Sequence, residues 1–246
     1  MINEPVRVVC DDFQNAWLEV VKQLIASGWE VRNLIAQIKN PTVLDHTFHE
    51  KMEIYARAQR ILRPKQVAYT IFPHGLYRHT GTATDLFAAY NRPRGLFERL
   101  HRIKPGWGTY FRRMTKYEGA NGTVNQLQRI ITAIRDREYL SKAAYTVLIQ
   151  KPGGETVRPL GGPCLNYIAV QTEQGQAGRP LTLALLAVYR NHDFLERAYG
   201  NYWGLCNLLM FLAKEVGGLP GPLTCVSSHA YVAGKKRELK QLVEGF

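Results

Sequence analysis

The sequence predicts an α/β (α+β) fold in a single domain, residues 1–246, in which helices are layered on a mixed β-sheet. Three observations support this class. The 246 residues, with 46% apolar side chains, are enough for one substantial core. Helix-like and strand-like segments follow one another without the strict alternation of an all-parallel sheet. The chain also shows no internal repeat, no low-complexity run and no Gly/Ser linker that would separate two domains.

Apolar residues at three- and four-residue spacing mark the helices. Thr123 and Gln126 form a capping-box pattern ahead of one such stripe, and Gly217-Gly218 closes the last helix. The expected helices are Asp12–Ala26, Met52–Leu62, Thr84–Tyr90, the stripe from Val124 to Ile134, and the largely apolar Tyr202–Val216.

The strands are expected in short apolar runs bounded by turn residues. These runs are Leu34–Ile38, Val67–Phe72, Ala143–Gln150, Leu165–Gln171, Leu181–Arg190 and Leu223–Val232. Because they mix irregularly with the helices, a sheet with both parallel and antiparallel neighbours is favoured.

Net charge is the one unusual bulk property. The chain has 32 Lys and Arg against 20 Asp and Glu, a formal net charge of +12. A basic balance favours anionic partners such as nucleotides, nucleic acid or polyglutamate-like tails. The basic residues are spread along the chain, which fits a solvated surface equally well. A nucleic-acid partner therefore stays open and is not the prediction.

The expected compartment is the cytoplasm, and no membrane partner is expected. No window approaches the roughly 18 uncharged apolar residues that a membrane span needs. The first residues include Glu4, Asp11 and Asp12 and form no apolar signal core. The four cysteines show no CxxC pair and are expected to be free thiols. The seven histidines show no metal-ligand pairing with acids or cysteines, so no metal is expected.

Cys164 lies in the segment GGPCLNYIAVQ, where a Gly-Gly-Pro turn precedes a predicted strand. A thiol at the mouth of a strand can be held in one direction of attack, as a nucleophile requires. A buried, inert thiol is the commoner role of a single cysteine. The residue alone leaves both interpretations open.

Three further polar patterns follow Cys164. The segment YRNHD places Arg190 at a strand end, where it could bind a phosphate and lower a thiol pKa, or belong to a polar turn. Asn201 begins a buried helix, where a helix cap is its structural alternative. His229 and Tyr231 are two residues apart on a predicted strand, so their side chains share one face.

The order of these patterns resembles the thymidylate synthase family. The motifs of the family occur here in the same order and at similar separations. They are Pro-Cys, then Y-R-x-x-D, then Gly-Asn at a helix start, and then H-x-Y on a strand. The resemblance covers roughly residues 105–232, and the N-terminal ~100 residues diverge. It implies a thymidylate synthase-like domain that works as a homodimer with sheets packed back to back.

The resemblance implies that Cys164 is the nucleophile that adds to carbon 6 of a pyrimidine ring. Carbon 5 then receives a one-carbon unit from methylenetetrahydrofolate, so the chain would be a transferase acting on a pyrimidine nucleoside monophosphate. Arg190 would bind the nucleotide phosphate and support the thiolate. Asn191 takes the place of a family serine beside that phosphate, and Asp193 would help to fix the pyrimidine.

Asn201 matches the family asparagine that reads the ring edge. Its amide can donate to oxygen 4 of uracil and accept from the ring N–H, whereas cytosine presents the reverse pattern. The resemblance therefore favours a uracil-type base, with dUMP as the favoured substrate. His229 and Tyr231 match the pair that holds the sugar hydroxyl.

The resemblance implies further roles for four residues upstream of Cys164. Tyr110, in GTYFRR, would assist proton removal from carbon 5. Asp85, in TDLFAAYN, takes the place of a helical glutamate that organises water and the folate. Arg32 is the candidate for a mobile phosphate-binding arginine. Lys142 takes the place of a pair of arginines donated across the dimer.

Departures from the family pattern keep other functions open. Leu165 replaces the histidine that usually follows the nucleophile, and Ser227-Ser228 replace a glycine-aspartate stretch. These changes affect the residues expected to contact the folate more than those expected to contact the nucleotide. Reduction of the new group would give methyl, and capture by water would give hydroxymethyl, as in pyrimidine nucleotide hydroxymethylases. A non-catalytic nucleotide- or nucleic-acid-binding protein on this scaffold, or an unrelated α/β protein with a structural thiol, are the alternatives.

Overall fold

The fold was analysed on a computed structural model of the chain. The structure describes residues 4–91, 108–119, 122–136, 145–150, 162–174 and 180–246.

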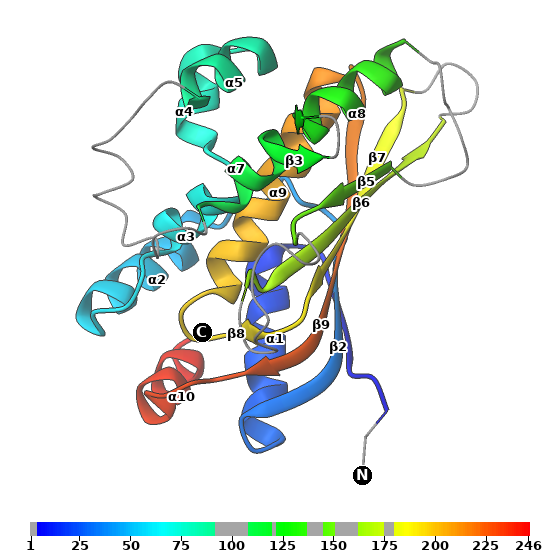
Figure 1. The fold of residues 1–246 in the computed structure, drawn as a ribbon. Helices are drawn as coiled ribbons and strands as arrows, with labels where there is room; N and C mark the ends of the chain where they lie inside the picture. The colour runs from blue at the N-terminus through cyan, green and yellow to red at the C-terminus, as the bar shows by residue number, and fades with distance from the viewer. Residues whose placement is uncertain (1–3, 92–107, 120–121, 137–144, 151–161, 175–179) are drawn as a thin grey trace.

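The described chain folds around one mixed β-sheet of order β1-β2-β9-β7-β6-β5, with the short β8 paired to β9 (Figure 1). The neighbours β1/β2, β7/β9 and β8/β9 are parallel, and the other neighbours are antiparallel. The mixed sheet predicted from the sequence is therefore confirmed. Its strands are β1 (Arg7–Cys10), β2 (Glu30–Ile38), β5 (Tyr145–Leu148), β6 (Leu165–Glu173), β7 (Thr182–Tyr189), β8 (His192–Asp193) and β9 (Leu219–Tyr231). A separate two-stranded antiparallel sheet pairs β3 (Tyr117–Gly119) with β4 (Gly122–Val124).

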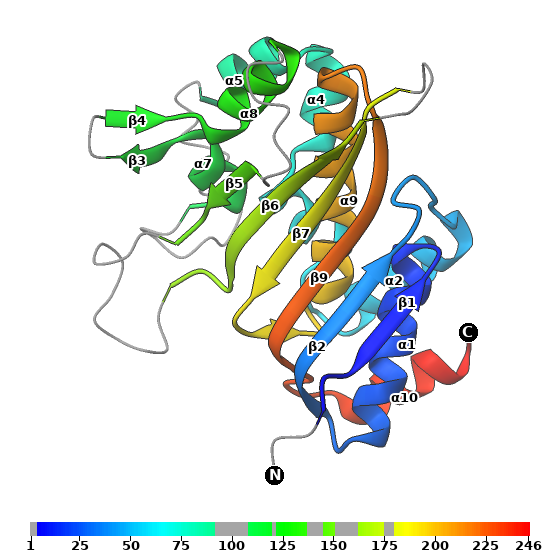
Figure 2. The same cartoon turned by 90° about the vertical axis from the view of Figure 1, so that its right-hand side faces the viewer.

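Helices cover one face of this sheet (Figures 1 and 2). The central one, α9, is buried along most of its length and packs against β7 and β9. The described helices are α1 (Phe13–Ala26), α2 (His46–Ala58), α3 (Pro64–Ile71), α4 (His74–Thr80), α5 (Ala83–Asn91), α7 (Tyr110–Thr115), α8 (Gln126–Arg135), α9 (Ala198–Glu215) and α10 (Lys236–Glu244).

The beginning of α9 is fixed by a close approach to α3. A side-chain carbon on Gly200 would meet Cβ of Val67 at 2.5 Å, and one on Gly204 would meet the carbonyl oxygen of Ala68 at 2.9 Å. Only glycine leaves room for the two backbones to approach this closely. The contact fixes the position of the first turns of α9 relative to α3.

One predicted strand is wrong. Val67–Ile71 belongs to α3, and Phe72 is the residue that follows it. The helix begins at Pro64 in the first helical position, where the missing N–H of proline costs nothing. Val67, Ala68 and Ile71 are buried, and this spacing places them on one helical face. The β-branched residues of this short run resembled a strand, but packing against α9 selects the helix.

Two predicted helix starts also differ. Asn125, not Thr123, caps α8, because its side chain accepts a hydrogen bond from the Gln128 N–H at 3.0 Å. Gln126 instead binds the backbone of Leu148 in β5 through both ends of its amide. The second helix begins at His46 rather than Met52, because Asp45 caps it by accepting from the Phe48 N–H.

The other face of the sheet carries no helix among the described residues (Figure 2). Val188 pairs in register with Val226, and Val226 pairs with Ile35, so the three form one row across β7, β9 and β2. All three are only half-buried. This row is an apolar strip on the sheet face that no described helix covers.

Candidate functional site

Cys164 immediately precedes β6 and is held by a tightly bonded turn. The Arg190 backbone N–H donates to the Cys164 carbonyl at 2.9 Å. The Arg190 side chain donates from Nε to the Pro163 carbonyl at 3.2 Å and from Nη2 to the Gly162 carbonyl at 3.0 Å. Gly162 has a φ of +89°, which favours glycine. The cysteine and arginine that the sequence singled out are thus direct neighbours.

The thiol of Cys164 is half-buried in a mixed electrostatic field. Burial raises its pKa, while the positive charges of Arg190 and Arg197 lower it and the carboxylate of Asp193 raises it. Burial is the largest of these effects, so the thiol is protonated at neutral pH. The positive charges of Arg190 and Arg197 can stabilise a thiolate or a bound anion.

Arg197 is a member of this cluster that the sequence reasoning missed. It is the residue before α9, and its backbone N–H donates to the Asp193 carbonyl at 3.1 Å. Its charge lowers the pKa of Cys164, Tyr110 and Tyr231. The available signal was an arginine placed between YRNHD and the glycine-asparagine pair of the helix start.

Tyr110 approaches the site from the helical layer. It opens α7, whose first turn is capped by the Thr109 hydroxyl. Its own hydroxyl accepts a hydrogen bond from the backbone N–H of Leu165, the residue after Cys164. Burial and the neighbouring Cys164 raise the pKa of Tyr110. The phenol is therefore neutral, close to the thiol, and able to donate its proton or relay one.

Asp193 and Tyr231 are register partners between β8 and β9. The Asp193 carboxylate accepts from the Leu195 N–H at 2.9 Å, yet burial raises its pKa. The rings of His229 and Tyr231 stack with centroids 5.0 Å apart and an interplanar angle of 18°, as their shared strand face predicts. His229 Nε2 also lies 3.3 Å from a Glu30 carboxylate oxygen. These residues extend the site along one end of β9.

Arg32 and Asn191 lie at the margins of this group. Arg32 is exposed on β2 in register with His229, and therefore stands beside the stacked ring pair. Asn191 is half-buried and follows Arg190 directly.

Asn201 lies inside the first turns of α9, with a side chain that is 4% exposed. Because Arg197 is the residue that precedes the helix, Asn201 is not its cap. The Asn201 amide nitrogen lies 3.1 Å from Nε2 of His192, and Nδ1 of His192 lies 2.9 Å from the Ser227 hydroxyl. The structure thus connects Asn201 to the YRNHD segment and to β9.

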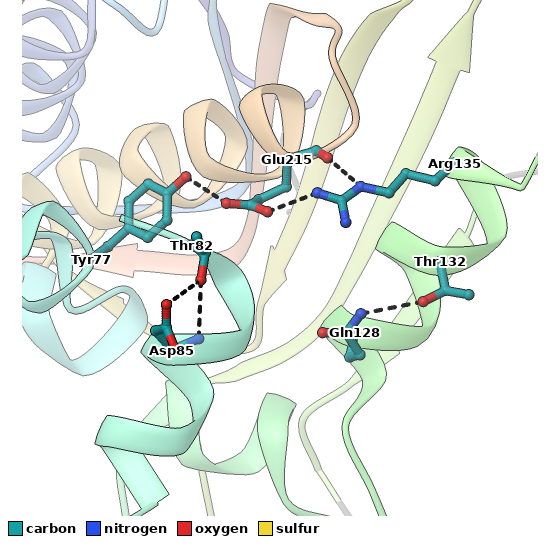
Figure 3. A network of polar contacts seen from close by, with 7 residues as sticks. All are labelled: Tyr77, Thr82, Asp85, Gln128, Thr132, Arg135 and Glu215. Carbon is teal, nitrogen blue, oxygen red and sulfur yellow. Dashed lines mark hydrogen bonds and ion pairs between the residues drawn. The ribbon is translucent and has the colours of Figure 1, made fainter. Parts of the chain in front are cut away.

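Asp85 is not brought to this group. It lies in the first turn of α5, where its carboxylate accepts from the Thr82 hydroxyl at 2.8 Å while its N–H donates to that hydroxyl (Figure 3). This is a local capping arrangement. α5 lies near the end of α9 that carries Glu215 (Figures 1 and 3), whereas Asn201 lies at the other end. The 18 residues of α9 separate the two ends by about 27 Å. Lys142 falls outside the described residues.

Within the described ranges, no three His, Cys, Asp or Glu side chains gather as a metal site would require. The same part of the chain holds no helix with the length and apolar character of a membrane span.

Comparison with known proteins gives two distant relatives. The chain is 28% identical over 124 residues to a protein of Methanosarcina mazei named "Putative thymidylate synthase", and 27% identical over 124 residues to one of the same name from Methanosarcina barkeri. Each match covers 50% of this chain and 52% of the relative, so the chain spans about half the length of the curated relatives it matches. No protein-family model matches the chain. These relatives suggest a thymidylate synthase-like relationship and an enzyme of nucleotide metabolism.

Proposed function

We propose that this protein transfers a one-carbon unit from methylenetetrahydrofolate to carbon 5 of a uracil-type pyrimidine nucleoside monophosphate, with dUMP favoured. The observation that carries the proposal is the placement of Cys164 beside two arginines, with the Tyr110 phenol close by. A thiol, a phosphate-binding cation pair and a proton-transfer group are the parts that nucleophilic activation of a phosphorylated pyrimidine needs.

The residues of the chain account for activation of the ring. After losing its proton, the Cys164 sulfur forms a bond to carbon 6, and the electron pair of the 5,6 double bond moves onto carbon 5 and oxygen 4. Carbon 5 thereby becomes a nucleophile. Arg190 and Arg197 stabilise the thiolate and the nucleotide phosphate. Tyr110 serves as the proton relay when carbon 5, now bonded to the one-carbon unit, gives up its hydrogen. The electron pair left on carbon 5 expels the folate nitrogen and forms an exocyclic methylene, and the sulfur leaves as the 5,6 double bond re-forms when hydride or water adds to that methylene.

Recognition of the nucleotide is assigned to the residues along β8, β9 and α9. Asp193 and Asn201 face the base, while His229 and Tyr231 hold the sugar. Arg32 and Asn191 are placed at the phosphate. The proposal is supported by the electrostatic proximity of Asp193 and Tyr231 to Cys164, by the contacts that connect Asn201 and His229 to the same strands, and by the two relatives' names.

Methylenetetrahydrofolate would supply the one-carbon unit and, for a methyl product, the reducing hydride. Asp85, the residue that the family resemblance directs toward the folate, instead bonds Thr82 in the first turn of α5, near the far end of α9. The described residues therefore support the nucleotide half of the reaction and identify no folate contact. Methyl and hydroxymethyl products both remain within the proposal.

The test is release of tritium from carbon 5 of labelled dUMP in the presence of methylenetetrahydrofolate, with product masses read directly. The wild-type chain is expected to release tritium, and Cys164→Ser is expected to abolish the release. Cys10→Ser, a half-buried cysteine on β1 outside the site, is the matched control and should retain it. No release from dUMP or any other pyrimidine monophosphate would overturn the proposal.

One observation favours a second function. Burial raises the pKa of Cys164 and keeps the thiol neutral, which is compatible with a nucleotide-binding protein on this scaffold that does no chemistry. In that case dUMP would bind with an affinity that Arg190→Gln weakens, while Cys164→Ser would bind as the wild type does and no tritium would be released.

A further inference from the structure

A buried chain of hydrogen bonds runs from Asn201 in α9 to β9. Asn201 Nδ2 and His192 Nε2 are 3.1 Å apart, and His192 Nδ1 and Ser227 Oγ are 2.9 Å apart. His192 and Ser227 are 1% and 0% exposed. The polar atoms of His192 and Ser227 are therefore out of contact with water and depend on their protein partners.

The donors and acceptors of this chain can be ordered. Burial lowers the pKa of His192 to about 3, so the ring is neutral and has one donor and one acceptor nitrogen. The Asn201 amide nitrogen can only donate, so Nε2 of His192 accepts from Asn201 Nδ2–H. Nδ1 of the neutral ring therefore carries the proton and donates to the Ser227 oxygen.

The His192 ring is held in place by aromatic packing. It stacks on Tyr189 with centroids 4.1 Å apart and an interplanar angle of 5°, and the ring of Tyr202 meets it edge-on at 5.6 Å. A ring packed on a face and an edge in a close-packed interior cannot turn over freely. The acceptor Nε2 therefore stays aimed at Asn201.

We propose that His192, held by Ser227, is a positioning residue that fixes the Asn201 amide in the orientation that binds uracil and rejects cytosine. An unrestrained asparagine can turn its amide over and satisfy either base. With one amide hydrogen committed to His192, Asn201 keeps its second N–H for oxygen 4 and its Oδ1 for the ring N–H, which is the uracil pattern. This inference rests on the proposed function, because it assumes that Asn201 faces the base.

The test measures binding of dUMP and dCMP separately, by calorimetry and without folate. His192→Phe keeps a stacked ring and removes both nitrogens, and Ser227→Ala removes the acceptor that sets the tautomer. Tyr202→Phe is the matched control, because it removes a buried hydroxyl next to His192 that has no hydrogen-bond partner in the described chain. Thermal unfolding confirms that each variant is folded.

The wild type is expected to prefer dUMP, and His192→Phe is expected to lower the dUMP-over-dCMP affinity ratio by about tenfold or more. Ser227→Ala should lower the ratio less, and Tyr202→Phe should leave it unchanged. An unchanged ratio in folded His192→Phe overturns the inference but leaves the proposed function standing, since dUMP still binds. A wild type that binds neither nucleotide overturns both.

A second measurement does not depend on the variants' folding. The nitrogen-15 spectrum of the wild-type histidines is expected to show His192 neutral, with its proton on Nδ1. A proton on Nε2 would reverse the direction of the hydrogen-bond chain and overturn the inference.

Discussion

The Tyr110 hydroxyl accepts a hydrogen bond from the backbone N–H of Leu165, with oxygen and nitrogen 3.4 Å apart. Leu165 is the residue after Cys164 and the first residue of β6, so this contact joins α7 to the strand that carries the thiol. A phenol that reaches the mouth of β6 can serve both as a structural partner of the backbone and as a proton carrier beside the sulfur.

Tyr110→Phe separates these two roles. We expect the tritium release from dUMP to fall by about 100-fold or more, as for loss of a general acid–base group. The free energy of unfolding should fall by only about 1 kcal/mol, because one modest hydrogen bond is lost. Iodoacetamide labelling of Cys164 should persist. A variant that keeps the wild-type release rate would remove Tyr110 from the proposed chemistry.

The two arginines beside Cys164 are expected to tune its reactivity unequally. Arg190 lowers the thiol pKa more than Arg197 does, so Arg190→Gln should move the midpoint of alkylation to higher pH by more than Arg197→Gln. Arg190→Lys keeps the charge and is the matched control. The rate of iodoacetamide modification of the Cys164 peptide, followed by mass spectrometry across pH, measures the midpoints. Identical midpoints in all four proteins would show that neither charge reaches the sulfur.

Much of the framework followed from local sequence patterns, because long amphipathic stretches and continuous apolar runs have few alternatives. The helix after Asp12 and the strand after Cys164 are examples. The sequence could not reveal Val67 as helical, since that choice depends on its fit against Gly200. β1 and α10 were missed, because a four-residue strand and a charged terminal helix carry weak periodicity.

The candidate site was anticipated less completely than the fold. The residue order around Cys164 and Arg190 indicated neighbours, and the structure places them in contact. Arg197 and His192 could not be singled out from the sequence. Arg197 matters through its proximity to the Cys164 thiol, and His192 through its contact with Asn201, and both depend on the three-dimensional fold. Asp85 matched only a position in a short segment, and its local cap with Thr82 explains the residue without any ligand.

Burial of His192 makes stability depend on pH in a predictable direction. The unfolded chain binds a proton at this residue below its ordinary pKa of 6.5, whereas the folded chain does so only near pH 3. The contribution of neutral, buried His192 to the free energy of unfolding is therefore fully present above pH 6.5. It is lost as the pH falls toward 3, with a slope of up to about 1.4 kcal/mol per pH unit.

The measurement is urea unfolding of the wild type and His192→Phe between pH 4 and 7. As the pH falls, the unfolding free energy of the wild type should decrease more than that of His192→Phe. Burial also lowers the pKa values of His49 and His74, but these two residues contribute equally to both proteins. A pH-independent difference would mean that His192 is solvated or charged in the folded state.

The close approach of α9 to α3 predicts an asymmetric response of two helical glycines to the same change. Gly200→Ala would place a methyl group 2.5 Å from Cβ of Val67 and 2.8 Å from the Pro64 carbonyl oxygen, and should cost about 1–3 kcal/mol of stability. Gly75→Ala, in α4 with no atom within 4 Å, should change stability by less than about 0.5 kcal/mol or raise it. Chemical denaturation of both variants tests this, and equal effects would contradict the packing.

We predict that the sheet face that no described helix covers packs back to back against a second copy of the chain. Val188, Val226 and Ile35 form its apolar row, and such a row is costly to leave in water. Val226→Lys places a charge at the centre of this row and should convert a dimer to a monomer, because an unpaired charge is costly to bury. Val43→Lys, at an exposed position outside the sheet, is the matched control. Light scattering after size-exclusion chromatography gives the masses. A wild type that is monomeric at micromolar concentration would contradict the predicted dimer.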